Sequence, residues 1–131
     1  MAEEAQLLLA AAELAREQAY APYSRLFVGA AVMSAKGKMY AGCNVENASY
    51  GLSVCAERTA IFAAVAAGER RIQSLAVVSS AREPSMPCGA CRQVIQEFAA
   101  SPDMPIALAG AAGAMVHTTL AELFPRPFTL P

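Results

Sequence analysis

The sequence predicts a three-layer α/β/α domain with a mixed sheet of about five strands. Segments with helical periodicity alternate with strand-like runs in the order helix, hairpin, helix, strand, helix, strand, strand. Strands joined by a helix are expected to run parallel, whereas a hairpin is antiparallel. The chain has 131 residues, enough for one hydrophobic core and too few for two, so residues 1–131 are expected to form a single domain.

The helices are predicted from composition and from their end signals. Residues 2–18 are rich in Ala, Leu, Glu and Gln and carry an apolar stripe. A second helix is expected over residues 55–67, with Gly68 as its C-cap, and a third over residues 89–100. A short last helical turn is expected to end before Pro125.

Five apolar runs with strand-forming residues are expected to make the sheet. Residues 26–34 and 38–46 flank a Lys36-Gly37 turn and are predicted to form a hairpin. The other strands are expected over residues 72–80, 105–109 and 115–119.

The charge distribution favours a small, weakly charged substrate. Eleven acidic and ten basic residues leave a net charge of −1, and no basic stripe of the kind that binds nucleic acid is present. The most apolar run, residues 7–12, follows Glu3 and Glu4 and therefore indicates a helix rather than a signal core. No run is long enough to cross a bilayer. We expect a cytoplasmic protein that binds neither nucleic acid nor membranes.

Three of the four cysteines are predicted to bind a metal ion. Cys88 and Cys91 are one helical turn apart at the start of the third helix, and Cys55 opens the second. Helix N-termini favour thiolate over thiol, so these sulfurs would attract a cation. Three thiolates can bind Zn²⁺ and leave a fourth position for water. Cys-x-x-Cys also occurs in thiol redox proteins and structural zinc modules, which are the alternatives from another class.

Neither candidate for a fourth protein ligand is persuasive. Strand alternation places Cys43 with Met39 and Ala41 on an apolar face, where a small buried thiol is expected. His117, the only histidine, lies in a short late strand and is expected to be a surface or packing residue. Water is therefore the favoured fourth ligand, and the site would be hydrolytic.

Charged residues beside the cysteines complete the predicted site. Glu57 lies in the first helical turn after Cys55, where both can reach a ligand beyond the helix end and the carboxylate can transfer protons. The alternative is that Glu57 only favours the helix N-terminus. Arg58 is expected to hydrogen-bond to the thiolates and balance their charge. Arg92 could help, although a solvated surface arginine is at least as good a description.

With these motifs in place, nearly the whole chain resembles the small zinc-dependent cytidine deaminases. The resemblance rests on the segments Tyr20-Ala21-Pro22-Tyr23-Ser24, Val28-Gly29-Ala30-Ala31, Gly42-Cys43-Asn44-Val45-Glu46-Asn47, Cys55-Ala56-Glu57-Arg58-Thr59-Ala60 and Pro87-Cys88-Gly89-Ala90-Cys91-Arg92-Gln93-Val94. Cys-x-Glu followed by Pro-Cys-x-x-Cys is the signature of zinc deaminases. The resemblance implies that Glu57 shuttles protons during hydrolysis at C4 of cytidine or 2′-deoxycytidine, with release of ammonia in pyrimidine salvage.

The resemblance also implies residues that bind the substrate. Asn44 and Glu46 would bind the ribose hydroxyls, and strand alternation independently places them on the face opposite Cys43. Ala56 would also contact the substrate. Phe128, in Phe124-Pro125-Arg126-Pro127-Phe128, would pack on the base in a neighbouring subunit of a homotetramer.

One position departs from the family pattern. Leu26 stands where the family usually has a phenylalanine that lines the base pocket. Alternation in a strand would place Leu26 and Phe27 on opposite faces, so Phe27 would not substitute for the missing ring. We expect an aliphatic wall that leaves the chemistry intact. A deaminase for a modified aminonucleoside such as blasticidin S is the alternative on the same scaffold.

Overall fold

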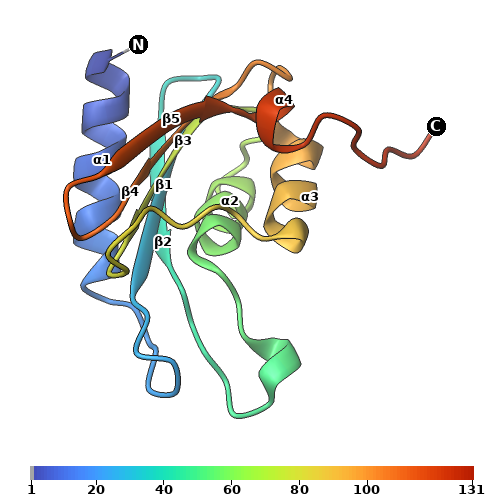
Figure 1. Ribbon diagram of the computed structural model, residues 1–131. Coiled ribbons are helices and arrows are strands. Elements are labelled where there is room, and N and C mark those ends of the chain that lie inside the picture. Colours follow the sequence, from blue (N-terminus) through green and yellow to red (C-terminus); the bar gives the residue numbers. More distant parts are fainter. Residues whose placement is uncertain (1) are drawn as a thin grey trace.

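The central sheet has five strands in the order β2-β1-β3-β4-β5 (Figure 1). In this computed structural model, which describes residues 2–131, β3 and β4 pair in parallel and the other neighbours are antiparallel. The predicted mixed five-stranded sheet is therefore confirmed. The strands are β1 (Val28–Ser34), β2 (Met39–Cys43), β3 (Ile72–Ser79), β4 (Pro105–Ala109) and β5 (Met115–Thr119).

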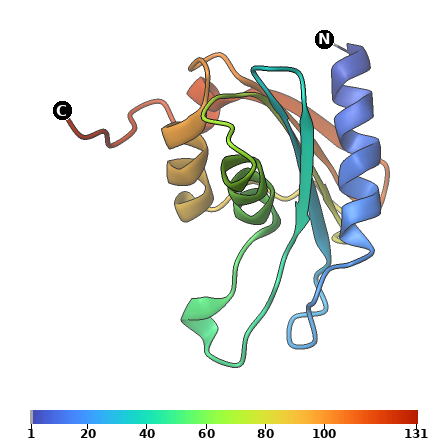
Figure 2. The ribbon, with the colours of Figure 1, turned by 180° about the vertical axis from the view of Figure 1, so that it is seen from behind.

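Helices cover both faces of the sheet and give the predicted three layers (Figures 1 and 2). One face is covered by α1 (Ala2–Arg16), and the other by α2 (Ala56–Ala66) and α3 (Gly89–Phe98). A one-turn helix, α4 (Leu120–Leu123), follows β5. The 3₁₀ turn η1 (Tyr50–Leu52), which the sequence did not lead us to expect, projects beyond the sheet. No helix within residues 2–131 combines the length and apolar character needed to cross a membrane.

Two glycines let helices approach the sheet closely. A Cβ at Gly29 would overlap the Ala12 carbonyl oxygen and lie 2.6 Å from the Arg16 amide nitrogen, both in α1. On the opposite face, a Cβ at Gly42 would lie 2.5 Å from the Ala60 amide nitrogen in α2. The second contact matters for function, because the N-terminal turn of α2 carries the predicted site.

Cys43 lies on the predicted face of its strand, but the prediction that it is buried there is wrong. Cys43 pairs with Gly29 and thus faces the α1 side, together with Met39 and Ala41. Because β2 is the edge strand, this face is only partly covered: Met39 and Ala41 are exposed and Cys43 is half-buried. The buried side chains of the hairpin come from β1.

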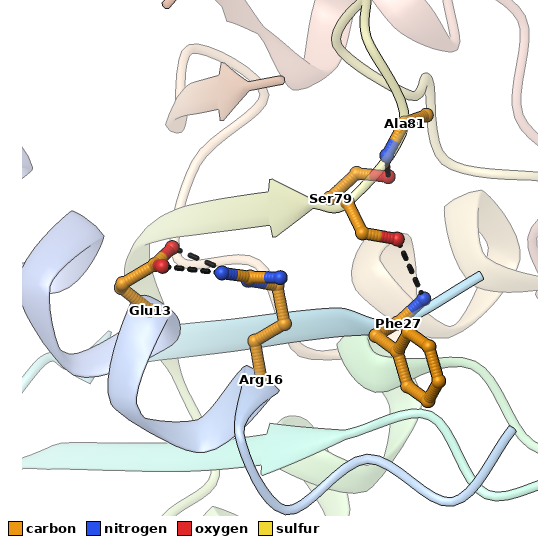
Figure 3. A network of polar contacts seen from close by, with 6 residues as sticks. Glu13, Arg16, Phe27, Ser79 and Ala81 are labelled. Atoms are coloured by element: carbon orange, nitrogen blue, oxygen red, sulfur yellow. Dashed lines mark hydrogen bonds and ion pairs between the residues drawn. The ribbon is translucent and has the colours of Figure 1, made fainter. Parts of the chain in front are cut away.

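The first strand begins at Val28, two residues later than predicted. Leu26 and Phe27 thus precede the strand, and strand alternation does not fix their directions. The Phe27 amide donates to Ser80 Oγ (2.9 Å), just as the Ala81 amide donates to Ser79 Oγ at 3.0 Å (Figure 3). The Ser79 and Ser80 hydroxyls therefore add hydrogen bonds to the backbone here, beside the bond from the Ser80 amide to the Phe27 carbonyl (2.8 Å). In the same view, the Glu13–Arg16 ion pair closes the last turn of α1.

Candidate functional site

Three cysteines from two helix N-termini form the only cluster of potential metal ligands found within residues 2–131. The Sγ atoms of Cys55, Cys88 and Cys91 all lie within 4.8 Å of one another. The Cys55–Cys88 distance is 3.9 Å and the Cys88–Cys91 distance is 3.3 Å. Neither Cys43 nor His117 belongs to the cluster, in agreement with their exclusion as ligands.

Local backbone structure brings these sulfurs together. Cys55 is the N-cap of α2, and Cys88 is the N-cap of α3, where its sulfur accepts a hydrogen bond from the Cys91 amide. Cys91 is completely buried one turn into α3. Both helices thus direct the partial positive charge of their N-termini toward the sulfurs, which stabilises thiolates there.

The thiols share protons when no metal is bound. A hydrogen bond from the Cys91 thiol, with a further contribution from Arg58, lowers the pKa of Cys55 to about 5. The same pairing raises the pKa of Cys91 above its ordinary value, and burial adds to the effect. One sulfur is therefore a thiolate while its neighbour retains a proton. A divalent cation that displaces the remaining protons would relieve the repulsion among three thiolates.

The spacing of the sulfurs fits tetrahedral zinc. Zn–S bonds of about 2.3 Å in a tetrahedron place the sulfurs about 3.8 Å apart. The 3.9 Å and 3.3 Å separations lie on either side of this value. The set of three sulfurs supplies three of the four ligands that zinc takes, and a site with three protein ligands is typical of catalytic rather than structural zinc.

Glu57 is buried beside the cluster, with 6% of its surface exposed. Burial raises its pKa to about 7, and the charge of the Cys55 thiolate acts in the same direction. A merely helix-capping carboxylate would be expected to lie at the surface. The burial therefore favours the proton-transfer interpretation over the alternative of helix-dipole stabilisation alone.

The two arginines differ in what they contact. Arg58 donates from Nη2 to Cys55 Sγ at 3.4 Å, as predicted for a charge-balancing residue. Arg92 neither hydrogen-bonds to the sulfurs nor lies free in solvent at the surface. Its Nε donates to the Pro87 carbonyl (2.8 Å) and its Nη1 to the Leu123 carbonyl (2.5 Å). This half-buried side chain therefore joins two backbone segments by hydrogen bonds.

Asn44 and Glu46 both hold the loop that precedes β1. Asn44 accepts a hydrogen bond from the Val28 amide (2.9 Å) and donates to the Leu26 carbonyl (2.7 Å). Glu46 accepts from the backbone amides and hydroxyl at residues 23–24, which lowers its pKa. A cavity of ≈ 420 Å³ adjoins this carboxylate and is lined by Tyr23, Ser24, Glu46, Asn47, Tyr50 and Ser53.

The remaining predicted substrate contacts lie in different parts of the molecule. Leu26 is 37% exposed at the loop that Asn44 holds, whereas the Ala56 side chain is fully buried in α2. Phe128 is 66% exposed on the C-terminal segment, which extends away from α3 in Figures 1 and 2. Within one chain, Phe128 is therefore not packed into the cysteine site.

Sequence reasoning missed the residues that shape the loop over residues 22–28. Ser24 donates its hydroxyl proton to Glu46 and accepts from the Leu26 amide (3.0 Å), so it links two predicted substrate-binding residues. Arg25 has φ of 61°, a left-handed conformation that is uncommon for a residue other than glycine. The Tyr-Ser pair in the quoted motif was the available signal for Ser24, and nothing in the sequence marked Arg25.

Comparison with known proteins agrees with this geometry. Residues 2–106 match the cytidine and deoxycytidylate deaminase zinc-binding region. The chain is 49% identical over 122 residues to the cytidine deaminase of Sporosarcina psychrophila, covering 93% of this chain and 89% of that protein. It is 47% identical over 124 residues to that of Halalkalibacterium halodurans, covering 95% and 93%.

A solved structure gives the same result for the fold. The crystal structure of cytidine deaminase from Burkholderia pseudomallei superimposes with a TM-score of 0.88 at 49% identity, and the match covers 94% of this chain and 98% of that one. The matched family region spans all three clustered cysteines and Glu57. The chain belongs to the cytidine and deoxycytidylate deaminase family of zinc-binding proteins.

Proposed function

We propose that this protein catalyses the zinc-dependent hydrolytic deamination of cytidine and 2′-deoxycytidine. The products are ammonia and uridine or 2′-deoxyuridine. The single observation that carries the proposal is the buried Glu57 beside three sulfurs that are close enough together to hold one zinc ion and would leave its fourth ligand position free. The similarity to cytidine deaminases over most of the chain supports the choice of substrate.

Proton transfer is assigned to Glu57. Bound zinc supplies the Lewis acidity that makes water a competent nucleophile near neutral pH. Glu57 takes a proton from that water and delivers it to N3 of the pyrimidine as C4 is attacked. It then takes the remaining proton from the hydroxyl on C4 and delivers it to the amino group, so that the C4–N bond breaks, the C4 carbonyl forms and ammonia leaves. Burial keeps this carboxylate out of bulk water, so the protons pass between Glu57 and the substrate.

Arg58 is assigned a supporting electrostatic role. Zinc with three thiolates has a net charge of −1, which reduces its electrophilicity. The hydrogen bond from Arg58 to Cys55 withdraws electron density from one sulfur and offsets part of this charge. Removal of this donor would therefore weaken both metal affinity and turnover.

The ribose is assigned to Asn44 and Glu46, which lie at the end of β2 on the same side of the sheet as α2. Their existing hydrogen bonds to the loop fix the orientation of both side chains and leave further acceptor capacity on the oxygens. Leu26 forms an aliphatic wall for the base, and Ala56 lies directly between Cys55 and Glu57 at the start of α2.

We assign Phe128 to the base pocket of a neighbouring subunit in a homotetramer. Its 66% exposure in a single chain supports a contact made between subunits. Other large apolar side chains exposed on the α2 side, Tyr50 (90%), Leu52 (65%) and Phe62 (47%), are also suited to burial on assembly. A cytoplasmic location fits a site that needs reduced thiols.

A combined metal and turnover assay tests the proposed function. We expect one zinc per chain, together with loss of cytidine absorbance and release of one ammonia per cytidine consumed. Full zinc occupancy without turnover of any pyrimidine nucleoside would instead indicate a structural zinc module. Turnover of blasticidin S in preference to cytidine would indicate the aminonucleoside deaminase. Thiol–disulfide exchange without zinc would indicate an oxidoreductase.

A further inference from the structure

The segment after α4 is tied to the helix that carries two of the cysteines. Residues 124–131 form neither helix nor strand, and in Figures 1 and 2 they extend from α4 outward, away from the body of the domain. This C-terminal segment contains Phe128, a residue that is 66% exposed. A chain end without secondary structure is usually mobile unless specific contacts hold it. Two consecutive residues of α3 provide such contacts.

The first contact is made by Arg92. Its guanidinium donates to the Leu123 carbonyl at the end of α4 (2.5 Å) and to the Pro87 carbonyl (2.8 Å). The Pro87 carbonyl belongs to the peptide bond that leads into Cys88. One planar guanidinium therefore fixes both the start of the C-terminal segment and the loop that delivers a metal ligand.

The second contact is made by Gln93. Its Nε2 donates to the Phe128 carbonyl at 3.0 Å, on the surface of α3. Between the two contacts, Pro125 and Pro127 fix two φ angles, and Phe124 packs against the core of the α2 side. The stretch from Leu123 to Phe128 is thus held at both ends and stiffened between them.

We infer that Arg92 and Gln93 are positioning residues that fix the direction in which Phe128 is presented. This inference rests on the proposed function, because it concerns the contact of Phe128 with the base in a neighbouring subunit. The same α3 helix begins with Cys88 and Cys91. The helix α3 therefore carries metal ligands of its own subunit and also orients Phe128, which would contact the base in the neighbouring subunit.

A double-mutant cycle separates positioning from simple packing. Gln93→Leu preserves shape but removes the donor to the Phe128 carbonyl. The loss of one exposed hydrogen bond should raise KM for cytidine about three-fold, with kcat and zinc content unchanged. In a Phe128→Ala background, Gln93→Leu should then change KM no further. Gln96→Leu is the matched control, because within residues 2–131 no hydrogen bond from Gln96 to the C-terminal segment is found.

Equal effects of Gln93→Leu in the two backgrounds would overturn the inference, as would an unchanged KM in the single variant. Arg92→Lys provides an independent arm. A lysine cannot donate to both carbonyls in the planar geometry of arginine, so KM should rise by at least about three-fold. A KM for Arg92→Lys equal to that of wild type would contradict the assigned role of the guanidinium.

Limited digestion with chymotrypsin tests the hydrogen bond between Gln93 and the Phe128 carbonyl without any nucleoside substrate. The Phe128 carbonyl bound by Gln93 belongs to the Phe128–Thr129 peptide bond, which this protease can cleave. Mass spectrometry should show that Gln93→Leu loses residues 129–131 about three times faster than wild type and Gln96→Leu. Equal cleavage rates in all three proteins, or no cleavage in any of them, would refute the claim that Gln93 holds the C-terminal segment. Because this assay is independent of turnover, its outcome is distinguishable from failure of the proposed function.

Discussion

Gly42→Ala should damage the site through the backbone of α2 without touching any site residue. The added Cβ would lie 2.5 Å from the Ala60 amide nitrogen and 2.8 Å from the Thr59 carbonyl carbon, whereas ordinary contact begins at 3.4 Å. Both neighbours are backbone atoms that cannot rotate away. The N-terminal half of α2 must therefore move by about 0.9 Å relative to β2. Overpacking of this kind costs about 1–3 kcal/mol of the free energy of unfolding.

The same displacement would move Glu57, because it lies two residues before Thr59 in α2. A shift of about 1 Å at a reacting group can reduce turnover about 100-fold. We therefore expect kcat/KM for cytidine to fall by at least about 10-fold, even when the variant is fully folded and loaded with zinc.

Urea denaturation and steady-state kinetics of zinc-saturated protein measure these two effects. Gly51→Ala is the control, because no atom lies within 4 Å of a Cβ added there, and it should change stability by less than about 0.5 kcal/mol. If Gly42→Ala matched this control in both stability and kcat/KM, the claim that α2 is held against β2 by close backbone contact would be refuted.

Three further predictions concern the loop before β1 and the far end of α2. Leu26→Phe should lower KM for cytidine about two- to ten-fold with kcat unchanged, since an aromatic contact contributes about 0.5–1.5 kcal/mol; an unchanged or higher KM in initial-rate assays contradicts this. Arg25 has φ of 61°, which a β-branched residue tolerates poorly, so Arg25→Val should lower the unfolding free energy by about 1–2 kcal/mol, whereas Arg25→Asn should not. Equal urea midpoints for the two variants would show that backbone strain at this position does not affect stability. The Tyr40 hydroxyl donates to the buried Glu69 (2.9 Å), which raises the pKa of Tyr40, so this stabilisation is complete below about pH 10 and lost as pH rises further. The difference in urea midpoint between wild type and Tyr40→Phe should therefore be present at pH 8 and shrink above pH 10; a constant difference would show that the hydroxyl is not involved.

Elements with local signals were predictable from the sequence. Ala67 is the C-cap of α2 and Gly68, with φ of 102°, follows it, so the predicted C-cap is one residue late, and both β4 and β5 match their predicted bounds. The positions of Cys55 and Cys88 also followed from local structure, because an N-cap residue points its side chain beyond the helix end, and Cys91 lies three residues after Cys88. These features depend on neighbours within one helical turn or one strand.

Features that depend on distant segments could not be predicted. The burial of Cys43 depends on how far α1 extends over the edge strand β2. Strand alternation predicts the face on which Cys43 lies, but not how much of that face the helix covers. The contacts of Arg92 join α3 to residues about thirty positions later, and no spacing in the sequence encodes that pairing. The late start of β1 likewise follows from bonds between the loop and Asn44, sixteen residues away from Val28.

The most direct test of the account is the activity of Glu57→Gln with its metal content measured on the same sample. Glutamine preserves the shape of the buried side chain but cannot take a proton from water or pass it to the pyrimidine. We expect one zinc per chain, as in wild type, and a loss of kcat for cytidine of about 100-fold or more. Zinc-loaded Glu57→Gln with wild-type kcat would contradict the assignment of Glu57 as the proton-transferring group.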